Sequence, residues 1–172
     1  MKVKNFLFGL LLVPALAVGF NSCKDKDDDT DKDYAADIAG SYKGGISLKN
    51  EILAENVVIM VARTADNKVT LSMDQTVLES IPIKIDCTSD VSKESSVNGN
   101  TSVVLPVESL APLAELLDNP QMAAGLAVLI AQAVDGKVTL PVNVSGSLLG
   151  GKAELSIVLA SVFPLRYTGG KQ

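Results

Sequence analysis

The sequence predicts a mainly β protein, a closed barrel of about eight antiparallel strands with a helical hairpin inserted before the last strands. Three observations lead to this fold class. Apolar residues recur at every second position through most of residues 34–172, which is the period of a half-buried strand. Turn-forming residues separate these runs at short intervals. Between residues 108 and 134 the apolar spacing changes to that of a helix.

The chain opens with a predicted secretory signal peptide over residues 1–22. Two lysines precede an almost wholly apolar stretch from Phe6 to Phe20. A positive start followed by a short apolar region is typical of such a signal, and the stretch is too short for a comfortable membrane span.

The signal ends at Ser22-Cys23, where a small residue stands directly before a cysteine. This arrangement resembles a bacterial lipobox, in which the cysteine is lipidated and becomes the mature N-terminus. Phe20 and Asn21 depart from the usual residues of that box, and lipoproteins of the Bacteroidetes type have relaxed boxes. We therefore expect lipid attachment at Cys23. The alternative is ordinary cleavage after Ala17, which leaves Cys23 as a thiol able to bridge Cys87 in an oxidising compartment.

Residues 23–33 are predicted to be the lipidated acidic tether. Residues 24–33 contain six Asp and three Lys and cannot bury a core. A stretch of this composition after the lipidated cysteine resembles the export signal that sends Bacteroidetes lipoproteins to the outer cell face. The resemblance implies an outer-membrane lipoprotein exposed at the cell surface, with display toward the periplasm as the alternative. The protein would then be bound to the membrane through the acyl chain on Cys23.

The folded body is expected over residues 34–172, and five strands are predicted before the helical insert. A Gly44-Gly45 pair in the first strand predicts a bulge, and the segment from Thr64 to Asn67 predicts the turn of a hairpin. A polar segment over 88–100 is expected to be a loop with a turn at Asn98-Gly99. The five predicted strands cover residues 39–49, 56–63, 68–74, 81–87 and 101–105.

Two of these strands carry unusual residues. The strand over 56–63 is apolar on both faces, so both faces should be covered. Pro82 stands on the face opposite the apolar residues of its strand, which predicts a sheet edge or a bulge there.

The helical insert spans 108–134 and divides at Asn119-Pro120 into two predicted helices. The second, from Gln121 to Val134, is apolar nearly all round, so it is either buried or covers an apolar surface. It could be a lid over the barrel mouth that touches an apolar ligand, or a face that binds a partner. The third interpretation, which we favour on sequence alone, packs it outside the sheet on the strand over 57–61.

The chain then returns to strands. Residues 137–145 alternate, Gly150-Gly151 predicts a hairpin turn, residues 153–159 pair back, and residues 162–167 close the fold.

Three segments carry a resemblance to the calycin-like, or lipocalin-like, β-barrel of Bacteroidetes lipoproteins: residues 38–44, 66–71 and 151–155. The similarity covers Ile38 to roughly Thr168. True lipocalins open with Gly-x-Trp, and here Gly40-Ser41-Tyr42 stands in that place. The resemblance implies that Tyr42 packs at the barrel base beneath a basic residue of the last strand, Arg166. It also implies a binding function and no known reaction.

Composition excludes several kinds of chemistry. The 172 residues hold no His and two Cys, so serine triads, His-ligated metals and four-thiolate zinc sites are excluded. Fifteen basic against twenty acidic residues disfavour a nucleic-acid partner. The carboxylates of the body lie at turns or on polar faces, and neither a phosphate-binding loop nor a nucleophile elbow is present. We expect no catalytic residues, no metal and no cofactor.

Two functions remain from the sequence. The first is binding of a small apolar ligand inside the barrel, with a cavity lined by Leu71, Ile83, Val142 and Leu155. The second is a non-catalytic surface interaction module with a solid core that binds a protein or glycan partner. Small barrels can do either, because their own side chains can fill them.

Overall fold

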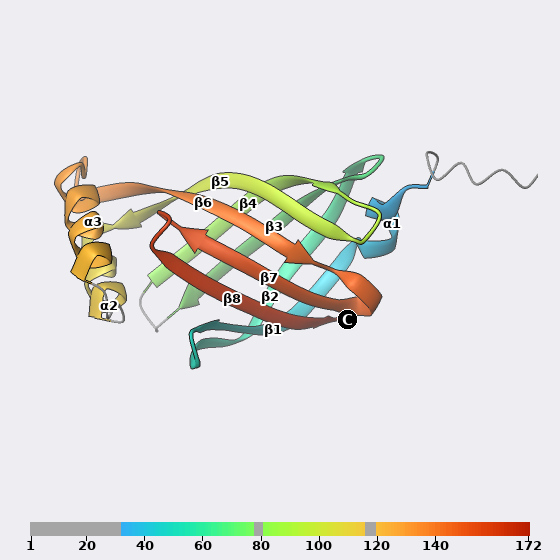
Figure 1. Ribbon diagram of the computed structural model, residues 1–172, viewed down its shortest axis with the longest axis horizontal. Helices are drawn as coiled ribbons and strands as arrows, with labels where there is room; N and C mark the ends of the chain where they lie inside the picture. Colours follow the sequence, from blue (N-terminus) through green and yellow to red (C-terminus); the bar gives the residue numbers. More distant parts are fainter. Residues whose placement is uncertain (1–31, 78–80, 116–119) are drawn as a thin grey trace, which may run out of the picture. The chain divides into compact units, whose positions relative to one another are not determined.

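Eight antiparallel strands close into a barrel in which each strand pairs with the next and β8 returns to pair with β1 (Figure 1). The computed structural model describes residues 32–77, 81–115 and 120–172. The predicted mainly β, eight-stranded antiparallel fold is confirmed, and it agrees with a calycin-like barrel. The strands are β1 (Gly40–Leu48), β2 (Glu51–Ala65), β3 (Lys68–Val77), β4 (Ile81–Val91), β5 (Ser96–Pro106), β6 (Lys137–Ser147), β7 (Lys152–Leu159) and β8 (Phe163–Lys171).

Side-chain alternation decides which face of each strand turns inward. In β4 every second residue from Ile81 to Val91 is buried and the residues between them are exposed. β7 repeats the pattern from Ala153 to Leu159. Because the strand period is two residues, this alternation sends one apolar row into the barrel and leaves a polar row in water.

The first strand bends where the glycine pair predicted a bulge. The register of β1 with β2 shifts between Gly44 and Ile46, and the same stretch of β1 pairs with β8 from Tyr42 to Leu48. A Cβ on Gly44 would lie 1.9 Å from the carbonyl oxygen of Thr168, so only glycine lets β1 approach β8 this closely. The bulge is thus part of the seam that closes the barrel.

The two ends of the barrel carry different helices (Figure 1). At one end lies α1 (Tyr34–Ile38), whose Tyr34, Ala35 and Ile38 are buried. At the other end lies the insert between β5 and β6, which consists of η1 (Val107–Ser109), α2 (Leu110–Glu115) and α3 (Pro120–Ala131). A 3₁₀ turn, η2 (Leu149–Gly151), joins β6 to β7. The predicted helical insert before the last strands is confirmed, with Pro112 in the first turn of α2, where a proline is tolerated.

The favoured placement of the second helix against the strand over 57–61 is wrong. α3 contacts β6 at the end of the barrel. On β2, Val58 is 37% exposed and Met60 is 51% exposed, so the outward row of that strand stays uncovered. Apolar residues on both faces of a strand do not require cover on both faces, because exposed apolar residues are common on protein surfaces.

The predicted loop over 88–100 is also wrong. β4 continues to Val91 and β5 begins at Ser96, so the turn is shorter and lies earlier than Asn98-Gly99. The buried Ser89 explains why polar residues can remain in the sheet here. Its hydroxyl donates to the Asp90 carbonyl oxygen at 2.8 Å and accepts from the Asn98 backbone N–H at 2.7 Å.

The strand that holds Pro82 is paired unevenly. β4 pairs with β3 along its length, and Pro82 lies opposite Thr76. On its other side, among the described residues, β4 pairs with β5 only at Asp90 and Val91. A proline has no backbone N–H to donate, so it is tolerated in this stretch of β4, where pairing on the second side has ended.

Candidate functional site: the barrel interior and its helical end

The four predicted cavity residues are all buried and come from four different strands. Leu71 lies on β3, Ile83 on β4, Val142 on β6 and Leu155 on β7. Leu71 and Leu155 line an interior cavity of about 10 Å³, together with Ile59, Ser72, Met73, Ile85, Val144 and Ile157. A void of that size is at the lower limit for a single water molecule. Around Leu71 and Leu155 the described interior is therefore closely packed, and this void has no room for a lipid-sized ligand.

Two tyrosines fix the barrel end that carries α1. The Tyr42 hydroxyl donates to the Ile38 carbonyl oxygen at 2.8 Å, which ties β1 to the last residue of α1. The Tyr167 hydroxyl donates to the Tyr42 carbonyl oxygen at 2.8 Å and also reaches the Val57 carbonyl oxygen at 3.5 Å. Burial raises the pKa of Tyr42 and raises the pKa of Tyr167 to about 12. Both hydroxyls are hydrogen-bonded donors inside the core.

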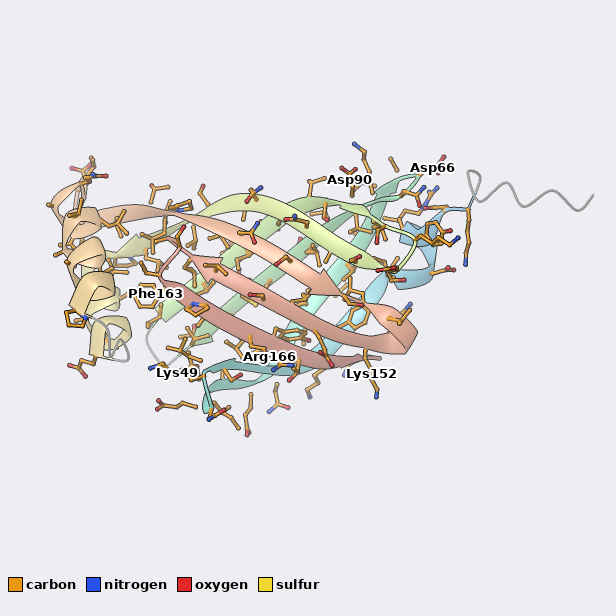
Figure 2. All side chains as sticks on the ribbon, in the orientation of Figure 1. Lys49, Asp66, Asp90, Lys152, Phe163 and Arg166 are labelled. Atoms are coloured by element: carbon orange, nitrogen blue, oxygen red, sulfur yellow. The ribbon has the colours of Figure 1, made fainter. Side chains whose placement is uncertain are left out.

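The predicted stacking of Arg166 on Tyr42 is wrong. Tyr42 is fully buried, whereas the Arg166 side chain is 65% exposed and lies 3.5 Å from Glu154. Figure 2 shows Arg166 on the wall formed by β8 and β1. Neighbouring residues of a strand face opposite sides of the sheet, so the inward aromatic residue of this stretch is Tyr167 rather than its neighbour. The alternation Phe163, Leu165, Tyr167 was the signal that could have identified it.

Polar contacts among Asp33, Asn67 and Arg63, which we call the latch, hold α1 against the β2–β3 turn. The Asp33 side chain caps α1 by accepting from the Ala35 N–H at 3.1 Å, and it also accepts from the Asn67 N–H at 2.9 Å and from the Arg63 guanidinium. The Asn67 side-chain oxygen accepts in turn from the Tyr34 N–H at 2.8 Å. The bond from the Asn67 N–H is the main cause that lowers the pKa of Asp33. Asp33, assigned to the tether by composition, is thus part of the folded body.

The helical end presents an apolar surface. In α3 the Leu126 side chain is 2% exposed and anchors the helix, and the position of Gly125 faces Val162. The face turned to solvent holds Ala123, Ala124, Ala127, Val128, Ile130 and Ala131, all exposed. We call these six residues the α3 face. Their side chains offer no hydrogen-bond donor or acceptor, so the α3 face can gain free energy only by being covered.

An open groove adjoins this surface where α3 leads into β6. It has a volume of about 430 Å³ and is lined by Val104, Gln132, Val134, Asp135, Lys137, Val138 and Thr139. Val134 and Lys137 exchange two backbone hydrogen bonds of 2.9 Å, which fix the chain that leaves α3 to the start of β6. The groove combines exposed valines with an exposed carboxylate, Asp135.

A second open groove lies on the barrel wall at the β1 bulge. It has a volume of about 320 Å³ and is lined by Gly44, Gly45, Ile46, Ser47, Ile52, Glu55, Asn56 and Thr168. Ser47 contacts β8 through a long bond of 3.4 Å to the Arg166 carbonyl oxygen. This groove holds backbone and short polar side chains and a single carboxylate, an arrangement without evident catalytic chemistry.

The remaining candidate residues have simple surroundings. Cys87 is buried as a free thiol, and burial raises its pKa. Cys23 and the signal peptide lie outside the described residues. Within residues 32–77, 81–115 and 120–172, no three His, Cys, Asp or Glu side chains gather as a metal would require. The helices in that part of the chain are all too short or too polar to cross a membrane.

Comparison of this chain with protein-family models, with curated proteins and with solved structures finds no significant match.

Proposed function

We propose that this protein is a cell-envelope lipoprotein whose filled barrel serves as a non-catalytic interaction module for a protein or glycan partner. The packed interior carries the proposal: the void that Leu71 and Leu155 line amounts to about 10 Å³. A barrel that binds a ligand inside needs a cavity of several hundred Å³. With the inside filled, function moves to the outer surface, where the α3 face and two open grooves lie.

The lipoprotein part of the proposal depends on the sequence. A positive start, a short apolar stretch and a small residue directly before Cys23 support lipidation, and the acidic segment that follows would keep the body away from an anionic surface. The acyl chain on Cys23 would anchor the protein in the outer membrane, with the barrel exposed at the cell surface.

Acyl labelling tests the anchor. We expect the full chain to incorporate a labelled fatty acid and the Cys23→Ala variant to incorporate none. The control is Cys87→Ala, which removes the other cysteine and should leave labelling unchanged. Normal labelling of the Cys23→Ala variant would overturn the lipoprotein assignment.

Native mass spectrometry of the full lipoprotein, released from its membrane in detergent, tests the filled barrel. We expect the mass of the acylated chain alone after detergent is removed in the gas phase. A bound apolar molecule that leaves only on denaturation would instead establish the other function, ligand binding inside the barrel.

A further inference from the structure

We infer that the α3 face and the adjoining groove dock a protein segment whose apolar face is flanked by lysines or arginines. The inference rests on the proposed function and names the kind of partner that the interaction module takes. Two observations support it: the exposure of apolar side chains on and beside α3, and an excess of acidic over basic residues in the helical insert.

The first observation is the exposure of α3. Val128 is 58% exposed and Val134, which follows the helix, is 72% exposed. Val104 of β5, which is 56% exposed, lines the same groove as Val134. An apolar surface that spans a helix, the turn after it and a neighbouring strand is larger than the scattered apolar residues expected on a monomer.

The second observation is charge. Residues 107–136 contain acidic residues and no Lys or Arg. Glu108, Glu115 and Asp135 are exposed in this segment, and Asp135 lines the groove. Lys137, at the start of β6, is the basic residue that lines the same groove. The helical insert therefore carries a net negative charge, which attracts a basic partner and repels an anionic lipid surface.

The test uses two synthetic amphipathic peptides of about 18 residues, long enough for five helical turns. Both have leucines on one face; one is flanked by lysines and the other by glutamates. The full lipoprotein is held in phosphatidylcholine vesicles and binding is followed by fluorescence anisotropy, with empty vesicles as the blank. We expect the lysine peptide to bind at least about tenfold more tightly than the glutamate peptide.

Matched variants locate the binding. Val128→Gln removes an apolar contact from the α3 face and should weaken lysine-peptide binding about tenfold, a loss within the range seen for single interface residues. Leu149→Gln is the control, because Leu149 is 64% exposed but lies in η2, at the β6–β7 turn. It should leave binding unchanged. Glu108→Gln combined with Asp135→Asn should weaken binding of the lysine peptide and reduce its dependence on salt.

Four outcomes would overturn the inference. They are equal binding of both peptides, equal loss in Val128→Gln and Leu149→Gln, capture of phosphatidylglycerol vesicles in preference to the peptide, and self-association through a Val128→Cys cross-link. The last two outcomes would identify a lipid surface or a second copy as the occupant. A ligand found inside the barrel by native mass spectrometry would instead overturn the proposed function, so the two failures are distinguishable.

Discussion

Tyr167 shows how one residue can hold three strands of the barrel together. Its ring is fully buried on β8, and its hydroxyl donates to the backbone of β1 and approaches that of β2. Removing the hydroxyl leaves buried carbonyl oxygens with fewer partners, and such groups are costly to leave unsatisfied. Ionisation of the same hydroxyl also makes the free energy of unfolding depend on pH in the alkaline range.

We predict that Tyr167→Phe flattens the alkaline unfolding curve. The folded pKa of about 12 lies above the ordinary value of 10.0, so the contribution of the protonated hydroxyl is complete below pH 10 and is lost as the pH rises toward 12. The loss amounts to roughly 3 kcal/mol in the wild type, from about 1.4 kcal/mol per pKa unit. Urea unfolding between pH 8 and 12 measures it. The same slope in both proteins above pH 10 would exclude this role for Tyr167.

Gly44 marks the point where a single added carbon should damage the barrel seam. Gly44→Ala would place a Cβ 1.9 Å from the Thr168 carbonyl oxygen, so we expect a destabilisation of about 1–3 kcal/mol. Gly170→Ala is the matched control on the same seam, because nothing lies within 4 Å of its added carbon. It should change the free energy of unfolding by less than about 0.5 kcal/mol. Urea denaturation of both variants checks the difference, and equal effects would contradict the close approach.

At the scale of elements, α1 depends on its cap rather than on its own length. A five-residue helix is too short to be stable in water alone, so Asp33, Asn67 and the buried face of α1 must hold it in place. The latch connects the N-terminal segment to the β2–β3 turn before the first strand begins.

We predict that Asp33→Ala speeds hydrogen exchange of the α1 amides while β4 and β7 remain protected. The matched control is Asp37→Ala, an exposed acid of the same helix that is not its cap. Acid should act like the mutation. The pKa of Asp33 is lowered, so the contribution of its carboxylate is complete above pH 3.8 and is lost as the pH falls through the folded value. Unchanged exchange of α1 in Asp33→Ala would remove the latch.

Elements with a single clear periodicity could be predicted from the sequence, and elements with conflicting signals could not. The turn at Asp66-Asn67 and the strands on either side follow from turn chemistry and strict alternation, and the structure confirms them. The strand stretch around Ser89 was missed because serines, asparagine and aspartate have low strand propensity. The buried Ser89 hydroxyl donates to the Asp90 carbonyl oxygen and accepts from the Asn98 N–H, and these bonds override that preference. They depend on which residues meet across the sheet.

The candidate site was predictable only in part. The alternation of apolar and polar residues along each strand identified Leu71, Ile83, Val142 and Leu155 as interior residues. Alternation alone decides which face of the sheet a side chain occupies. Whether a cavity lies between them depends on how eight rows of side chains interlock, which no single strand encodes. The exposure of α3 was likewise beyond the sequence, since an apolar helix is usually covered and its partner within the fold cannot be identified from its own residues.

At the scale of the whole molecule, the packed interior makes a direct prediction. Leu155→Ala should cost about 2–5 kcal/mol and leave a void that admits benzene, because apolar cavities of that kind stay dry and bind small apolar molecules. The control is Ser156→Ala, an exposed neighbour on β7. Thermal unfolding with and without benzene measures both effects. Stabilisation of the wild type by benzene would show that the barrel already contains usable space.

The pairing of β1 with β8 sets the order in which this molecule can be built. The seam pairs Tyr42 with Lys171 and Leu48 with Leu165, so β1 cannot complete its pairing until β8 is present. Contacts of such long sequence separation form slowly. During synthesis β1 has no partner on the side that β8 will occupy, and the barrel cannot close until β8 has been made. The export that the lipoprotein proposal implies would benefit from that delay, because the closure that makes the barrel rigid comes last.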